Sequence, residues 1–135
     1  MIAEQYNGLT LAYIGDAYYE LLVRNLVIKS GNGKVNDLHK MAVSYTSGEA
    51  QARFITAMID ENFLSEKEIE FYKKGRNCHT NQNRKNISVL IHQKATGFES
   101  LIGYLYLENQ YKRINEIMEY IEKIVKVVKD NGQKV

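Results

Sequence analysis

The sequence contains no proline and no tryptophan, and it has a single cysteine, Cys78. Without proline no helix is forced to kink, so the composition favours long helices. One cysteine can form neither an intramolecular disulfide nor a zinc site built on several thiolates. No apolar run approaches the roughly 20 residues that span a bilayer, and the N-terminus has no basic segment followed by a hydrophobic signal core. These absences predict a helical protein of the cytoplasm with no membrane partner.

The residues that are present have the composition of an ordinary globular domain. The chain has 135 residues, of which 44% are hydrophobic and 25% are charged. This length suits one domain with one core, and we expect a single domain over residues 1–135. The formal net charge of +2 is too small to indicate a polyanionic partner by itself.

Apolar residues recur at three- and four-residue spacing along almost the whole sequence, and strict alternation over a strand length is hard to find. The fold class is therefore predicted to be all-α. Ser65 and Glu68 form a capping-box pattern, which marks the start of one helix. The last helix carries one apolar stripe, which we interpret as core in preference to a dimer seam. We expect helices over residues 8–30, 36–43, from 46 or 47 to 62, 65–75, 88–107 and 111–129.

Two of these helices carry an isolated acid in apolar surroundings. Asp16 is the only residue charged at neutral pH in the run LTLAYIGDAYY, and Glu99 is the only one in ATGFESLIGYLYL. Gly15 and Gly97 lie close to these acids. Because glycine inside a helix costs on the order of 1 kcal/mol relative to alanine, it is usually kept for close backbone approach or for access to a site.

If the two helices pack together, Asp16 and Glu99 meet, and their desolvation and repulsion would cost several kcal/mol per ion without compensation. A divalent cation compensates well, and oxygen ligands without a histidine at a matching spacing indicate magnesium or manganese in preference to zinc. Such cations catalyse in-line displacement at phosphorus. The alternative is that Asp16 lies on a solvated helix face together with Thr10, and spacing alone favours that alternative.

The two acidic segments resemble known motifs. LAYIGDAYYELLV resembles the signature helix of the ribonuclease III family, in which a hydrophobic pair precedes Gly-Asp-Ala, and ATGFESLIGYLYLE resembles the second catalytic helix of that family. The intervening LHKMAVSYTSGEAQA and YKKGRNCHTNQNRKN are similar to the Mini-ribonuclease III branch, which has a nuclease domain and no separate double-stranded-RNA-binding domain. The resemblance runs from about residue 7 to residue 110.

The resemblance implies the helical endonuclease fold of ribonuclease III, acting as a symmetric homodimer. The implied reaction is magnesium-dependent hydrolysis of double-stranded RNA, with manganese as a possible substitute, leaving 5′-phosphate and 3′-hydroxyl ends. The implied substrate is a precursor of large-subunit ribosomal RNA. By motif position, Asp16 and Glu99 would be the catalytic residues and the metal ligands. Tyr13, Tyr18 and Tyr19 pack either across the dimer interface or in the core, and the sequence leaves both readings open.

Two positions depart from the full-length members of the family. Those members have a glutamate where this chain has Ala12 and an aspartate where it has Thr96. The Mini-ribonuclease III branch resembles this chain in that reduction, so we expect activity with weaker metal binding. The alternative is a catalytically silent relative that binds RNA within a ribonucleoprotein.

A polar segment without any acid precedes the second acidic helix. Residues 73–86 combine basic side chains with short hydrogen-bonding ones, which suit phosphate and ribose contacts. We interpret this segment as an RNA-binding arm, and the alternative is a solvated loop. The candidate RNA-binding residues are Lys73, Lys74, Arg76, Asn77, Arg84, Lys85 and Asn86.

Overall fold

A computed structural model of the protein describes residues 1–30, 33–78 and 86–133, with side chains up to Lys129. Within these residues the chain is helical and forms no strand, which confirms the all-α prediction. The elements are the 3-10 helix η1 (Ile2–Gln5) and the α-helices α1 (Gly8–Ser30), α2 (Val35–Thr46), α3 (Gly48–Asp60), α4 (Glu66–Arg76), α5 (Ile87–Leu107) and α6 (Tyr111–Gln133). No helix of the described residues is long and apolar enough to cross a bilayer.

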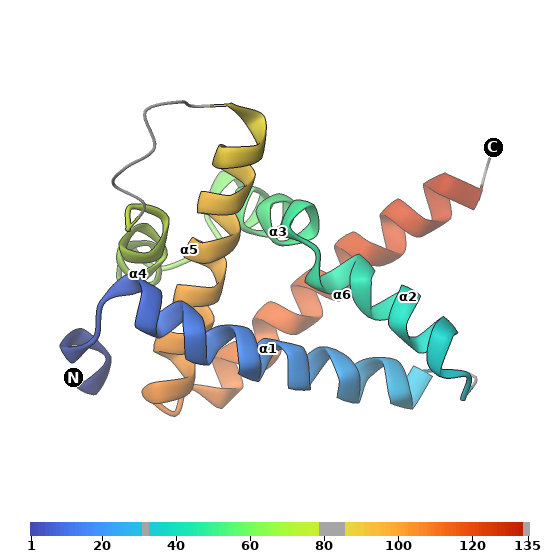
Figure 1. Ribbon diagram of the computed structural model, residues 1–135, viewed down its shortest axis with the longest axis horizontal. Coiled ribbons are helices and arrows are strands. Elements are labelled where there is room, and N and C mark those ends of the chain that lie inside the picture. Colours follow the sequence, from blue (N-terminus) through green and yellow to red (C-terminus); the bar gives the residue numbers. More distant parts are fainter. Residues whose placement is uncertain (31–32, 79–85, 134–135) are drawn as a thin grey trace.

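Helix α5 is the centre of the molecule. Helix α1 crosses it at a steep angle, while α3 and α4 pack against it from other directions (Figure 1). Every residue from 95 to 105 is buried except Glu99. A helix that is apolar on all sides requires such all-round burial. Within this stretch, Glu99 is therefore the residue whose side chain reaches the surface of the central helix bundle.

Most helix boundaries follow from local signals. Helix α1 has the predicted bounds, and α4 begins with the predicted capping box, in which Ser65 accepts from the Glu68 N–H and the Glu68 carboxylate accepts from the Ser65 N–H. One error concerns α2, which continues to Thr46 although the prediction ended it at residue 43. A tertiary contact holds this last turn, because Tyr45 is buried and its carbonyl accepts a hydrogen bond of 2.8 Å from the Tyr19 hydroxyl.

The N-terminal half of α6 belongs to the core, as the apolar stripe predicted. Ile114, Ile117 and Ile121 are buried, whereas Val128 is 47% exposed because the second half of α6 extends beyond the body of the molecule (Figure 1).

A half-buried ion pair anchors α6 to the start of α4. The Arg113 guanidinium donates to both carboxylate oxygens of Glu68, at 2.8 and 2.9 Å, and also to the carbonyl of Phe63. Burial by itself would raise the pKa of Glu68, but the hydrogen bonds from Arg113 and from the Ser65 N–H hold that pKa below its ordinary value. The pair therefore fixes α6 against the capping box of α4.

Candidate active site

The site is created by an unusually close crossing of α1 and α5. A Cβ atom placed on Gly15 would lie 1.8 Å from the carbonyl oxygen of Glu99, and one placed on Gly103 would lie 2.0 Å from the carbonyl oxygen of Leu11. The two backbones are thus in direct contact, and only glycine fits at either position. Close approach is what the glycine beside Asp16 led us to expect.

This crossing brings Asp16 and Glu99 together. The two carboxyl groups lie within hydrogen-bonding range of each other, although the residues are far apart in the sequence. Burial, reinforced by the hydrogen bond and the negative charge of Asp16, raises the pKa of Glu99 to about 8. In the absence of a cation the pair therefore holds a proton at neutral pH.

The expectation of an apolar setting is correct for Glu99 and wrong for Asp16. Glu99 is half-buried, whereas Asp16 is exposed to solvent. The helix face on which spacing placed Asp16 is exposed to solvent, and the same face meets Glu99. Asp16 is therefore both exposed and paired with Glu99. The result is an acidic pair at the rim of the core with one side open to a large ligand.

A third side chain at this pair comes from α3. Gln51 is only 3% exposed, and its Nε2 donates to the carbonyl of Thr46 at 3.4 Å. Its amide works against the rise in the pKa of the Glu99 carboxyl. The sequence analysis did not identify Gln51, because a single glutamine in an amphipathic helix carries no signal of its own.

The two positions that lack an acid are buried. Ala12 and Thr96 are each 6% exposed, and the Thr96 hydroxyl donates to the carbonyl of His92, one turn earlier, at 3.0 Å. Over the described ranges no group of three or more histidine, cysteine, aspartate or glutamate side chains is placed to hold a metal ion. The acidic part of the site therefore consists of Asp16 and Glu99.

Two carboxylates suit magnesium. Mg²⁺ commonly takes one or two protein carboxylates and completes its octahedron with water and substrate phosphate oxygens. The raised pKa of Glu99 shows that keeping both acids ionised is costly without a cation, and a hard dication would remove that cost. Asp16 and Glu99 would hold the ion, and their oxygen-only chemistry does not favour zinc.

The basic end of α4 lies beside this site. A Cβ atom on Gly75 would lie 2.4 Å from the Cβ of Ser100 and 2.8 Å from the carbonyl of Thr96, and these two residues precede and follow Glu99 in α5. A Cβ atom on Gly8 would lie 2.2 Å from the carbonyl of Lys74. The last turn of α4 is therefore wedged between the start of α1 and the middle of α5.

The structure places part of the predicted RNA-binding arm. Lys73, Lys74 and Arg76 form the last turn of α4, and Asn77 caps it. Arg76 donates to the Asn77 side chain at 3.0 Å and lies over the Tyr72 ring.

The remaining candidates of the arm follow that turn. Arg84 and Lys85 lie outside the described residues. Asn86 has a structural role that the sequence analysis did not foresee, because its side chain caps α5 by accepting from the Val89 N–H at 2.9 Å.

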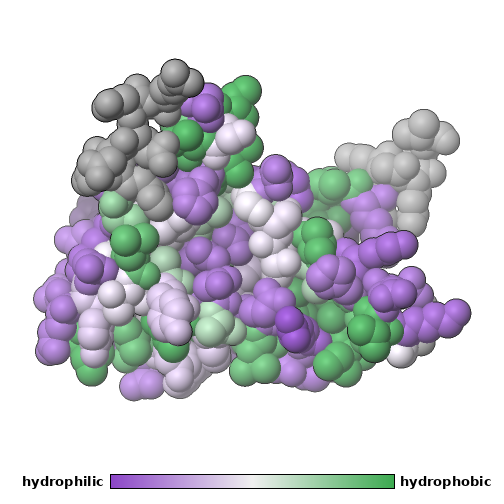
Figure 2. Space-filling view, viewed as in Figure 1, coloured by the Kyte–Doolittle hydropathy of each residue, from purple (hydrophilic) through white to green (hydrophobic). Residues whose placement is uncertain are grey.

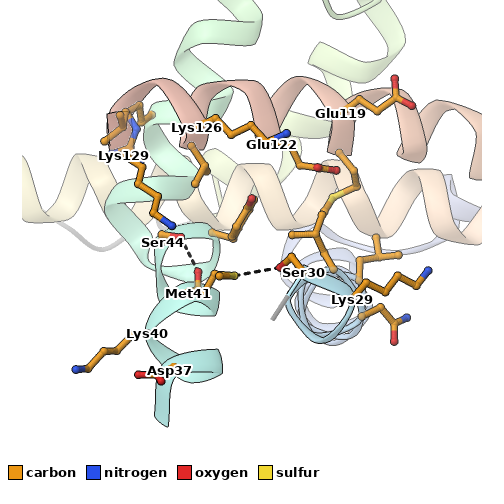
Figure 3. A pocket seen from close by; sticks show the side chains of 18 of the residues that line it. Lys29, Ser30, Asp37, Lys40, Met41, Ser44, Glu119, Glu122, Lys126 and Lys129 are labelled. Atoms are coloured by element: carbon orange, nitrogen blue, oxygen red, sulfur yellow. Dashed lines mark hydrogen bonds between the residues drawn. The ribbon is translucent and has the colours of Figure 1, made fainter. Parts of the chain in front are cut away.

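A large cavity lies away from this site. It has a volume of about 1230 Å³ and is lined by the second half of α1, by α2 and by α6, with neither Asp16 nor Glu99 in its wall. Charged side chains of both signs surround it, including Lys29, Lys126 and Glu122 (Figure 3). Its size does not make it the candidate site, because the Asp16–Glu99 pair lies at the α1–α5 crossing.

The fold is helical, and an aspartate and a glutamate meet where α1 and α5 cross. Comparison with known proteins identifies the family to which such a chain belongs. The Ribonuclease III domain model matches residues 9–110, which include both acids. The chain belongs to the ribonuclease III family, and within it to the Mini-ribonuclease III branch.

Individual relatives agree with this assignment. The chain is 44% identical to the Mini-ribonuclease 3 of Enterococcus faecalis, over 90% of this chain and 92% of that protein. It is 48% identical to the Mini-ribonuclease 3 of Acholeplasma laidlawii, over 78% of this chain and 84% of that protein. The crystal structure of a protein from Fusobacterium nucleatum is similar with a TM-score of 0.76 and 28% identity, covering 87% of this chain and 94% of that one.

Proposed function

We propose that this protein hydrolyses double-stranded RNA with Mg²⁺ held between Asp16 and Glu99. Its membership of the ribonuclease III family makes it an endoribonuclease. The observation that supports the metal assignment is the convergence of the two carboxyl groups at the α1–α5 crossing. Mn²⁺ is the expected substitute, and the expected products have 5′-phosphate and 3′-hydroxyl ends.

The two acids would contribute differently to metal and RNA binding. Asp16 is exposed and therefore accessible to a phosphodiester of the duplex, whereas Glu99 is half-buried and fixed by the core. Glu99 must release its proton before both acids can act as ligands, so ion binding is coupled to proton release from this carboxyl. When bound, the magnesium would activate the attacking water and stabilise the developing charge at phosphorus.

The RNA would be held mainly through its phosphates. Lys73, Lys74 and Arg76 offer positive charge at the end of α4, whose backbone contacts the residues that flank Glu99. Contacts to phosphate and to ribose hydroxyls provide affinity for a duplex without sequence specificity. We place Asn77, Arg84, Lys85 and Asn86 in the same RNA-binding arm, within a single catalytic domain over residues 1–135.

We further propose a symmetric homodimer, with α1 at the interface. The outer face of α1 carries large apolar side chains that the monomer leaves exposed, and Figure 2 shows apolar side chains among polar ones where α1 crosses the surface. A two-fold axis would pair this face with its own copy and present two acidic pairs to one duplex. The exposed side chains are Leu9 (51%), Tyr13 (83%), Leu21 (55%) and Ile28 (63%).

The resemblance to the Mini-ribonuclease III branch further supports the large-subunit ribosomal RNA precursor as the substrate. Such a precursor places the reaction in the cytoplasm, where bacterial ribosomal RNA is made.

The decisive experiment compares wild type with Asp16→Asn on a perfectly paired RNA, with and without Mg²⁺. Wild type should cut only with the metal, and the variant should not cut while binding RNA as wild type does. Asp37→Asn is the matched control, because it removes an exposed acid of α2 that lines the distant cavity. Undiminished cutting by Asp16→Asn refutes the assignment. A wild type that binds the duplex without cutting it in either metal would be the silent RNA-binding relative.

A further inference from the structure

Arg76, in the last turn of α4, is half-buried although its side chain is charged. Within the described ranges, no carboxylate forms an ion pair with it. A partly desolvated charge is costly unless an opposite charge or hydrogen bonds compensate for the lost water. A half-buried arginine without an acid therefore indicates a site for an anionic ligand.

The guanidinium of Arg76 is held in one orientation by Tyr72 and Asn77. Its central carbon lies over the face of the Tyr72 ring, 5.5 Å from the ring centroid, and its Nε donates to the Asn77 side chain at 3.0 Å. Among the described residues, no hydrogen bond uses its terminal nitrogens. These nitrogens form the edge of a guanidinium that can bind one phosphate group through paired, parallel hydrogen bonds.

The Tyr72 ring is fixed in turn by the central helix. Tyr72 is 2% exposed, and a Cβ atom placed on Gly97 would lie 2.5 Å from its Cε1 atom and 2.6 Å from its Cδ1 atom. Only glycine lets the ring lie this close to the α5 backbone. Gly97 precedes Glu99 by two residues, which is about 3 Å along the helix axis. The orientation of Arg76 is thus tied to the same rigid helix that carries Glu99.

We propose that Arg76 binds one phosphate group of the duplex end-on, with Tyr72 as the positioning residue that orients its guanidinium, so that the phosphodiester to be cut lies at Asp16 and Glu99. The inference rests on the proposed function, since it places a phosphate at a fixed distance from that site. A lysine would attract the phosphate with the same charge, but its ammonium is a point charge on a flexible stem and does not fix the orientation of the duplex.

The test separates the charge of Arg76 from its orientation. Arg76→Lys keeps the charge and loses the paired hydrogen bonds, whereas Arg76→Ala loses both. Tyr72→Leu removes the ring and leaves the arginine unchanged, and Tyr72→Phe keeps the ring. Tyr45→Leu is the matched control, because Tyr45 is also buried, at 5% exposed, but lies in α2 and is hydrogen-bonded through its backbone carbonyl.

Circular dichroism verifies that each variant is folded. If Tyr72→Leu does not fold, Asn77→Ala takes its place, since it removes the other contact that orients the guanidinium and lies at an exposed position.

The cleavage rate at saturating RNA is compared with the affinity for the duplex measured in chelator. Tyr72→Leu and Arg76→Lys should lower that rate about 10- to 100-fold, because a misplacement of about 1 Å can cost about 100-fold, while their affinity changes far less. Tyr72→Phe and Tyr45→Leu should cut at the wild-type rate. Arg76→Ala alone should reduce the salt dependence of binding, by about one phosphate contact. In the Arg76→Ala background, Tyr72→Leu should lower the rate no further.

The inference is overturned if Tyr72→Leu cuts saturating RNA at the wild-type rate, if Tyr72→Phe is as slow as Tyr72→Leu, or if the loss persists in the Arg76→Ala background. It is also overturned if Arg76→Lys loses affinity alone, since the arginine would then act only through its charge. This failure is distinct from failure of the proposed function. If Asp16→Asn is inactive while the Tyr72 and Arg76 variants cut as wild type does, only the role of this arginine falls. If Asp16→Asn still cuts RNA, the metal site itself is misassigned.

Discussion

Replacing Gly15 by alanine tests whether the α1–α5 crossing sets the geometry of the acidic pair. The new Cβ would lie 1.8 Å from the Glu99 carbonyl oxygen, whereas ordinary contacts begin at 3.4 Å, so the helices must separate by about 1.6 Å. The obstructing atoms are the carbonyl of Glu99 and the nitrogen of Gly103. Because these are backbone atoms, no side chain can move aside to relieve the overlap. Overpacking costs roughly 1–3 kcal/mol or more, and the better helix propensity of alanine returns about 1 kcal/mol.

We therefore expect Gly15→Ala to destabilise the protein by about 2 kcal/mol and to lower Tm by roughly 5–10 °C. The same displacement moves Asp16 relative to Glu99, and a misplacement of about 1 Å can reduce a rate about 100-fold. Thermal melting and single-turnover cleavage at 25 °C measure the two effects. Gly48→Ala is the control, since its Cβ would meet only the Ile91 side chain, at 3.6 Å. If Gly15→Ala keeps both the Tm and the rate of wild type, close backbone contact does not position the site.

Three further predictions follow from charge and exposure. Because burial and its acidic neighbour raise the pKa of Glu99 from 4.5 to about 8, the metal-free folded protein holds a proton between these pH values that the unfolded chain has released. Tm measured in chelator should therefore decrease as pH rises from about 5 to 8, and a Glu99→Gln variant that kept the same slope would contradict the assignment. Arg113→Met strands the buried Glu68 carboxylate and should cost roughly 3 kcal/mol by denaturant titration, whereas Lys67→Met breaks ion pairs that are exposed to solvent and should cost much less; equal losses would disprove the special role of the Arg113 pair. Tyr13→Asp should convert the proposed dimer into a folded monomer in light scattering after gel filtration, and an unchanged mass would remove α1 from the interface.

Local chemistry explains which parts of the fold could be predicted. The Ser65 capping box is determined by neighbouring residues, so it was found from the sequence, and the bounds of α1 were also predicted correctly. The last turn of α2 depends on the hydrogen bond from Tyr19 to Tyr45, two residues far apart in sequence, and was missed. Helix η1 was also missed, since the Ala3 N–H is held by the carboxylate of Glu108 at 2.9 Å, a contact that only the folded chain provides.

The candidate site, like the fold, could be predicted only in part. The glycine beside Asp16 led us to expect a close approach of two backbones, and Gly15 does contact the backbone of Glu99. Spacing favoured an exposed Asp16, and Asp16 is exposed. Spacing did not indicate that the exposed face of α1 would also meet Glu99, because this depends on how the two helices are rotated about their axes. The burial of Gln51 could not be predicted, since it depends on where α3 packs on α5.

The α1–α5 crossing also determines how the proposed catalytic pair should respond to heat. Its two acids are attached to the helices that form the middle of the core, and such elements open only with the free energy of global unfolding. Cutting activity should consequently persist up to the cooperative melting transition and vanish with it, without an earlier phase in which an intact domain has already lost its chemistry.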